Sequence, residues 1–228
     1  MTLQAISKGF LFYKNVGLKF SLYIFPVIIL FGFIASLGSS DSLGDGISIL
    51  DIIFLLFNNF LISPLVTIIA ILLANDLIDQ KNRDVLVYYA LSWQYILKVL
   101  VLSLISTIAI GLGLILFVVP GLIMAGLFLF INYFAVLENK SILESITLSW
   151  EKARSNLLQS ILMASFFWML TIFSLALLST LVSNYENLDE IPQIVTIVSS
   201  SLAIYIQVCL VCFPILIFFR NLTESNPK

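Results

Sequence analysis

Five stretches of this chain contain no charged residue, and they constrain the fold more than any other feature of the sequence. They cover residues 20–40, 52–75, 99–137, 155–185 and 191–219. Because the hydrocarbon core of a bilayer is about 30 Å thick, a helix of about 20 apolar residues spans it, and each stretch reaches that length. The chain is therefore predicted to be an all-α integral membrane protein.

The third stretch, 99–137, is too long for one span. As a single helix it would extend roughly 59 Å, about twice the hydrocarbon thickness. Pro120-Gly121 lies near its middle, where proline removes a backbone donor and glycine permits a turn. We expect a tight hairpin there, and close helix contact at Gly111 and Gly113. The whole chain, 1–228, then reads as one membrane domain of six transmembrane helices, at about 20–38, 52–74, 97–119, 121–137, 157–181 and 194–219.

The positive charges fall on one side of this six-span arrangement. All 11 Lys and Arg residues lie before the first span, between the second and third, between the fourth and fifth, or after the sixth. The charged residues of the opposite loops are all Asp or Glu. The positive-inside rule therefore predicts that both termini are cytoplasmic. The aromatic and basic segment before residue 20 is expected to lie along the cytoplasmic membrane surface. It is expected to remain attached and not to be a cleaved signal peptide.

The chain contains a weak internal repeat. Residues 60–105 align without a gap on residues 117–162. Asn75 then matches Asn132, Asn82 matches Asn139, and the sequence L-S-W occurs at 91–93 and at 148–150. Each unit is predicted to contain a helix that runs toward the cytoplasmic side, a short cytoplasmic segment and a helix that runs back across the membrane. Both units have the same orientation, so the sequence predicts a parallel two-helix repeat.

Short interfacial helices are expected between the two helices of each unit. Ser141 and Glu144 have the spacing of a capping box, in which each side chain satisfies a free backbone donor of the new helix. After them, apolar residues including Trp150 recur at helical spacing, and Glu144, Ser145 and Glu151 fall mainly on the other side. Trp93 occupies the matching place in the first unit. These segments either anchor helix ends only or form a lipid-contacting surface.

The segment from Val118 to Asn156 resembles a known family. The runs V-V-P-G-L-I-M-A-G (118–126), V-L-E-N (136–139) and S-W-E-K-A-R (149–154) are similar to the YciC family of bacterial inner-membrane proteins. They are also similar to the wider group that contains the glycerophosphoryl diester phosphodiesterase membrane domain. The resemblance implies a multi-pass protein of the bacterial inner membrane. It brings no catalytic residues, because the phosphodiesterase activity belongs to a separate soluble domain.

The sequence lacks the residues on which several kinds of chemistry depend. It has no histidine, which excludes the common proton shuttles and zinc sites. The apolar stretches carry no ionisable group of the kind that ion-coupled transporters use at membrane depth. We predict no catalytic, cofactor or metal site. The acidic residues of the cytoplasmic side are expected to be solvated charges (Asp76, Asp79, Asp84, Glu138, Glu144 and Glu151).

Four amides are the polar groups that could matter within the bilayer: Asn58, Asn59, Asn132 and Gln207. They are expected either to hold helices together by hydrogen bonds or to line a polar pocket or pore. The favoured function is non-enzymatic, with a structural, lipid-interacting or assembly role. The alternative is a passive transporter or channel for a small molecule or lipid. Expected partners are membrane lipids, and other membrane proteins or a second copy of the chain, but not nucleic acid.

Overall fold

The computed structural model describes residues 2–37, 49–183 and 193–225. These described residues are helical apart from short turns, and no strand occurs among them. Six helical segments of the described residues are long and apolar enough to cross a membrane, and three of these segments consist of consecutive helices. The prediction of an all-α membrane fold with six such helices is confirmed.

The helices follow one another with few breaks. In chain order they are α1 (Thr2–Leu37), α2 (Ile49–Phe57), the π-helix η1 (Asn58–Ile62), α3 (Ser63–Ile78), α4 (Val85–Leu116), α5 (Val118–Leu127), α6 (Ile131–Leu137), α7 (Ile142–Ser155), α8 (Leu157–Ser183), α9 (Gln193–Ile204), the π-helix η2 (Tyr205–Leu210) and α10 (Val211–Ser225). The segments α2–η1–α3 and α9–η2–α10 each form one continuous rod.

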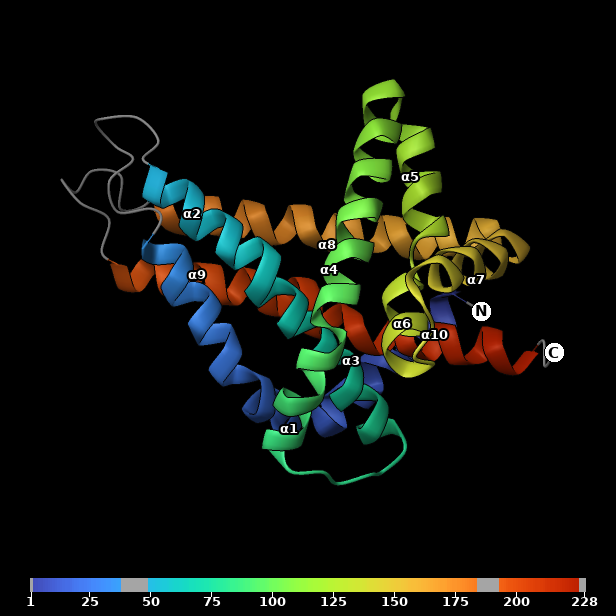
Figure 1. The fold of residues 1–228 in the computed structure, drawn as a ribbon, viewed down its shortest axis with the longest axis horizontal. Helices are drawn as coiled ribbons and strands as arrows, with labels where there is room; N and C mark the ends of the chain where they lie inside the picture. The colour runs from blue at the N-terminus through green and yellow to red at the C-terminus, as the bar shows by residue number, and fades with distance from the viewer. Residues whose placement is uncertain (1, 38–48, 184–192, 226–228) are drawn as a thin grey trace.

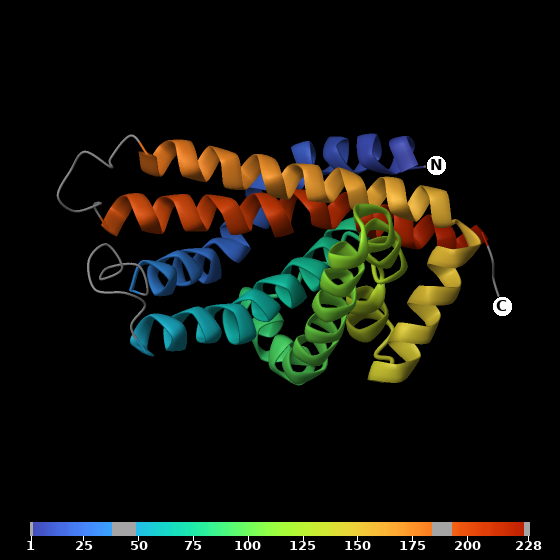
Figure 2. The ribbon, with the colours of Figure 1, turned by 90° about the horizontal axis from the view of Figure 1, so that it is seen from above.

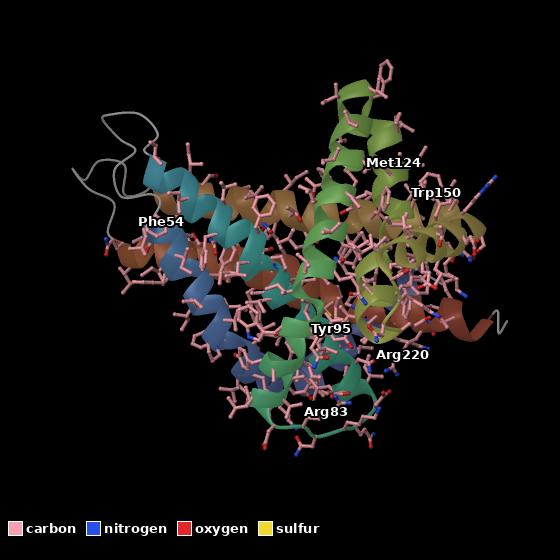
Figure 3. The ribbon with its side chains drawn as sticks, viewed as in Figure 1. Phe54, Arg83, Tyr95, Met124, Trp150 and Arg220 are labelled. Atoms are coloured by element: carbon pink, nitrogen blue, oxygen red, sulfur yellow. The ribbon has the colours of Figure 1, made fainter. Side chains whose placement is uncertain are left out.

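Most of these helices form one bundle. The last turn of α1, the first turns of α2 and α9 and the last described turn of α8 lie together at one end, and both termini lie at the other (Figure 1). The α4–α5 hairpin crosses α8 steeply, and its turn projects away from the bundle (Figures 1 and 2). Arg83 and Arg220 lie well away from Phe54 of α2 (Figure 3). We call the side that carries the termini, residues 79–84 and residues 138–141 the basic side.

Helix α1 differs from the expected leader and separate span, because it is one helix of 36 residues. At 1.5 Å per residue it is roughly 54 Å long, so it cannot lie wholly within the hydrocarbon core. Its first half packs against α8 and α10. A Cβ atom placed on Gly9 would lie 2.6 Å from the backbone nitrogen of Pro214. The leader therefore has one face packed on the protein and is not a free surface helix.

The turn of the α4–α5 hairpin lies at Phe117, three residues before the predicted position. Phe117 is extended (φ −167°, ψ 159°), and α5 begins at the next residue. Pro120 is in the first turn of α5, where its missing N–H has no partner to lose. A Cβ atom on Gly113 would lie 2.9 Å from Cα of Gly121, which confirms close contact there. Gly111 has nothing within 4 Å, so the predicted contact at that residue is wrong.

Both π-helical segments come just before a proline. Pro64 follows η1 and Pro214 follows η2. Proline has no N–H to donate to the carbonyl four residues earlier, and its ring crowds that carbonyl. In the wider π turn the backbone hydrogen bonds join residues five apart instead of four, which relieves this conflict. Such segments are frequent at functional sites, and η2 lies next to the cavity described below.

The core on the basic side is made of aromatic rings from α1, α6 and α10. The ring centroids of Phe20 and Phe213 are 4.9 Å apart, and those of Phe134 and Phe219 are also 4.9 Å apart, both edge-to-face. Phe130 lies 5.6 Å from Phe218. Offset and edge-to-face pairs of this kind pack densely, so this part of the bundle is a close-packed aromatic core.

Helix α7 has the predicted capping box but not the predicted faces. The Ser141 side chain accepts from the Glu144 N–H, and the Glu144 carboxylate accepts from the Ser141 N–H at 2.9 Å. The buried residues are Ser145, Ser149 and Ala153, spaced one helical turn apart. Ser145, expected on the polar face, is thus buried, because small side chains let α7 approach the bundle closely.

The predicted repeat stays a prediction, although several matched residues behave alike. Asn82 accepts a hydrogen bond from Lys19 at 2.7 Å, and its counterpart Asn139 accepts one from Lys98 at 3.1 Å. The serines of the two L-S-W sequences, at 92 and 149, are both fully buried. The units differ after these serines. Helix α4 continues to its hairpin, whereas the matching rod of the second unit breaks at Asn156 between α7 and α8.

Candidate functional site

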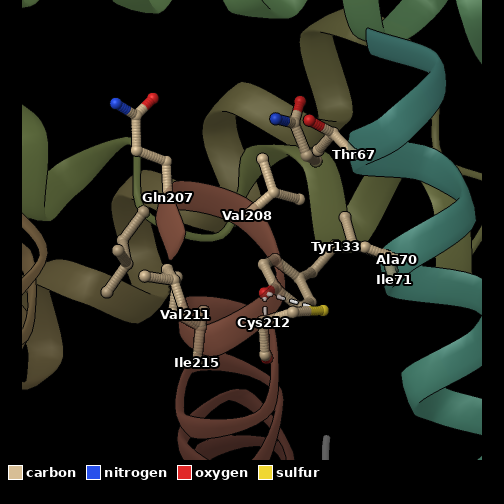
Figure 4. Close-up of a pocket in the computed structure, with 11 residues that line it drawn as sticks. Thr67, Ala70, Ile71, Tyr133, Gln207, Val208, Val211, Cys212 and Ile215 are labelled. Carbon is tan, nitrogen blue, oxygen red and sulfur yellow. Dashed lines mark hydrogen bonds between the residues drawn. The ribbon is translucent and has the colours of Figure 1, made fainter. Parts of the chain in front are cut away.

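A cavity of about 170 Å³ lies between α3, the α5–α6 break, and η2 with the start of α10 (Figure 4). Most of its wall is aliphatic. Its polar lining comes from α3, α6 and the η2–α10 rod: Thr67, Asn132, Tyr133, Gln207 and Cys212. Since each water occupies about 30 Å³ of liquid, a space of this size holds a few water molecules or one small solute.

Two of the four predicted amides meet in this cavity. Gln207 is placed by η2 and donates from Nε2 to the Ser174 hydroxyl at 3.3 Å. Asn132 lies near the start of α6, and its Oδ1 is buried with no hydrogen-bond partner among the described residues. A buried acceptor without a donor costs about 1–3 kcal/mol. The cavity therefore offers a free acceptor that water or a small donor would satisfy.

The other polar groups of the cavity are already bonded to nearby backbone. The Thr67 hydroxyl donates to the Ser63 carbonyl at 3.0 Å. The Tyr133 hydroxyl donates to the Cys212 carbonyl at 3.2 Å, which is shown as a dashed line in Figure 4. None of the residues lining the cavity is charged. The polar groups that line it are neutral hydrogen-bond donors and acceptors.

The other two predicted amides are not seen in this cavity. Asn58 is in η1 and donates from Nδ2 to the Phe31 carbonyl of α1 at 3.3 Å. It is 5% exposed, and its Oδ1 has no partner in the described part of the chain. This is a contact that holds two helices together and not a shared site with Asn132. The side chain of Asn59 falls outside the described residues.

The predicted interfacial residues are separate from the cavity. Trp93 on α4 is 58% exposed. Trp150 on α7 is 38% exposed and contacts Phe128 edge-to-face at 6.1 Å. Ser141 and Glu144 form the cap of α7. The hydrogen bond that the Ser141 N–H donates to the Glu144 carboxylate is the largest cause that holds the pKa of this carboxyl below its usual value.

The serine of the second L-S-W sequence has a role that its sequence did not reveal. The Ser149 hydroxyl donates to the Leu127 carbonyl at 2.7 Å and accepts from the Phe130 N–H at 3.2 Å. These are backbone groups that the break between α5 and α6 leaves without helical partners. Ser149 thus binds α7 to the break beside the cavity.

A buried charge cluster on the basic side was also missed. Asp76, expected to be solvated, is 4% exposed. Its Oδ2 accepts from the Tyr88 hydroxyl at 3.1 Å and forms an ion pair with Arg83 Nε at 3.0 Å. The sequence places Asp76 at the end of α3 and Tyr88 one turn into α4. Only the tight connection between those helices turns the pair inward, so helical spacing alone could not have found it.

A second set of contacts joins α10 to the end of α3. Arg220 donates to the Asn75 side-chain oxygen at 2.6 Å and forms an ion pair with Asp79 at 2.7 Å. Partial burial acts to raise the pKa of Asp79, but Arg220 and Lys81 outweigh it, and the pKa lies below its ordinary value. The sequence offered one signal for these contacts: a basic residue at the end of the last span and acidic residues at the end of the second.

The fold and the site define a class: an all-α, multi-pass membrane protein with a neutral cavity inside its bundle. Comparison of the chain with known protein families, with curated proteins and with solved structures gives no match.

Proposed function

We propose that the chain is a non-enzymatic membrane protein that acts by binding lipid on its basic side. The observation that carries this proposal is the outer face of the first half of α1. Leu3, Leu11 and Leu18 are 82%, 61% and 80% exposed, and Lys8 and Lys14 are exposed among them. At 100° per residue all five fall within an arc of roughly 140°, opposite the face that packs on α8 and α10.

This pattern suits the boundary between headgroups and acyl chains. Leucine side chains enter the apolar layer, while the lysine stems keep their ammonium groups at the level of the lipid phosphates. Lys8 and Lys14 form no ion pair with any carboxylate of the described residues. Their charge is therefore available to anionic lipid, and each lysine near such a surface contributes about 1 kcal/mol.

Helix α7 supplies a second contact with the same boundary. Leu143 is 75% exposed, and Trp150 has part of its indole exposed on the same helix. Lys152 and Arg154 lie in its last turn. A different face, through Ser149, is fixed to the bundle. We propose that α7 and the first half of α1 together form the lipid-binding surface.

The proposal extends to location and family. The distribution of all 11 basic residues supports an orientation with both termini in the cytoplasm. The segments 118–126 and 149–154 support membership of the YciC-like group and hence the bacterial inner membrane. Other membrane proteins or a second copy of the chain are further proposed partners.

The test uses Lys8→Gln combined with Lys14→Gln in full-length protein in lipid vesicles. Selectivity for an anionic over a zwitterionic spin-labelled phospholipid is measured by electron paramagnetic resonance at low salt. Loss of two lysines, at about 1 kcal/mol each, should lower the selectivity for the anionic lipid by up to about 30-fold. The matched control is Lys81→Gln, because Lys81 already pairs with Asp79 at 3.3 Å. Equal selectivity in all three proteins would refute the proposal.

The second candidate function is passive transport of a small neutral solute. The unpartnered Oδ1 of Asn132 favours it, because a solute donor would satisfy this atom. The aromatic packing around Phe134 and Phe219 closes the basic side in this conformation, so transport would require that packing to open. A solute flux that disappears in Asn132→Leu at constant folded amount would place transport ahead of lipid binding.

A further inference from the structure

A groove of about 470 Å³ runs along the lipid-facing surface between α1 and α9. It is lined by Phe25, Ile28 and Ile29 of α1 and by Ile197, Val198 and Leu202 of α9. Both helices belong to rods that are apolar enough to cross a membrane. For comparison, a dry apolar cavity of about 150 Å³ holds one benzene molecule. The groove has room for about three times as much apolar material.

The groove lies beside a line of contact between α1 and the α9–η2–α10 rod, which includes a hydrogen bond from the Ser201 hydroxyl to the Ile28 carbonyl at 3.2 Å. Near one end, a Cβ atom on Gly32 would lie 2.5 Å from the Ile197 carbonyl. Far toward the other end of α1, Gly9 lies against the backbone of Pro214. Between these contacts α1 contains Pro26, and the facing rod changes from α9 to the π-helix η2. Both irregularities disturb straight helix packing.

The groove ends at three hydroxyl groups on the side toward the basic end of α1. The Tyr13 and Tyr205 hydroxyls are hydrogen-bonded to each other, Tyr205 also bonds Ser21, and Ser21 donates to the Gly17 carbonyl at 2.6 Å. These bonds tie α1 to η2 and close the groove. The apolar part of the groove therefore begins next to polar groups. A phospholipid has the same order, because its apolar acyl chain begins next to its polar headgroup.

The face of α1 that lines the groove continues into the proposed lipid-binding surface. At 100° per residue, Lys14, Leu18 and Phe25 fall within an arc of roughly 40°. Lys14 precedes Ser21 by two helical turns, or roughly 10 Å along the axis. An ammonium group thus lies on the headgroup side of the groove, on the same face of one helix.

We infer that this groove holds one acyl chain of an anionic glycerophospholipid whose phosphate lies near Lys14. The inference rests on the proposed lipid-binding function and adds its site and ligand. Lipid tails are as apolar as the groove, so apolarity alone does not select an occupant. Selection comes from the polar boundary at Ser21 and Tyr205 and from the charge of Lys14.

The test is photo-crosslinking of the full-length protein in vesicles of an anionic glycerophospholipid, a fraction of which carries a diazirine on its acyl chain. Cross-linked peptides should concentrate at residues 21–29 and 197–205, several-fold above the exposed surface of α4. Val198→Trp should fill the groove and remove this enrichment. Ile108→Trp is the matched control, because Ile108 is 54% exposed and Val198 is 57% exposed. Ile29→Trp, from the opposite wall, is the second blocking variant, and thermal unfolding in detergent checks that each variant folds.

Uniform labelling of all exposed apolar surfaces, or unchanged groove labelling in both blocking variants, would overturn the inference. These failures are separable from failure of the proposed function. If the groove is unlabelled but Lys8→Gln with Lys14→Gln lowers anionic selectivity, only the groove is refuted.

Discussion

The close contact of α1 with α10 at Gly9 gives the most direct test of how this fold is held together. In Gly9→Ala the new Cβ atom would lie 2.6 Å from the backbone nitrogen of Pro214 and 2.7 Å from its Cα. Those atoms belong to a buried rod and cannot rotate away as a side chain could. The two helices must therefore move apart, and overpacking of this kind costs about 1–3 kcal/mol.

Gly111→Ala is the matched control, because Gly111 is also in a membrane-crossing helix and has nothing within 4 Å of the added Cβ position. Alanine is favoured over glycine inside a helix by roughly 0.5–1 kcal/mol. That gain is common to both positions and cancels in the comparison. We therefore expect Gly9→Ala to be less stable than Gly111→Ala by about 1–3 kcal/mol.

The assay is reversible unfolding in mixed micelles with increasing mole fraction of dodecyl sulfate, followed by circular dichroism. The free energies of unfolding of wild type and both variants are compared at one common condition. If Gly9→Ala and Gly111→Ala have the same stability, the first half of α1 is not packed on α10 as described. The outer face of α1 would then lose its assignment as the lipid-binding face.

Two further predictions concern the charge clusters of the basic side. Asp76→Leu should cost about 1–3 kcal/mol, because it leaves the buried Tyr88 hydroxyl without an acceptor, while Arg83, 43% exposed along its side chain, regains water. Adding Tyr88→Phe should recover part of that loss, and strictly additive losses in the double-mutant cycle would contradict the hydrogen bond. Asp79, whose pKa is lowered in the folded protein, contributes stability that is present above its unfolded pKa of about 3.9 and is lost as the pH falls through the folded value. Stability should therefore fall less steeply below about pH 4 in Asp79→Asn than in wild type, and equal slopes would exclude the contribution.

The break between α5 and α6 shows where reasoning from the sequence stops. The sequence located Pro120 and the second L-S-W motif, and both matter for this region. It could not show that Ser149 of α7 would satisfy the backbone at Leu127 and Phe130, because those residues meet only through the packing of α7 on the bundle. The same limit applies to the cavity. Asn132 and Gln207 were recognised as intramembrane amides, but nothing in their spacing joined them and separated them from Asn58.

The sequence by itself determined the all-α class and the six apolar helices, because a bilayer leaves no other way to satisfy the backbone of such long uncharged stretches. It also determined the cap of α7 at Ser141 and Glu144, since that pattern depends only on residues three apart. The tertiary structure alone decided which residues face one another. It buried Asp76 beside Tyr88, separated the amides and opened the groove between α1 and α9. These outcomes depend on helix crossings set by contacts such as Gly9 with Pro214, which join residues far apart in the chain.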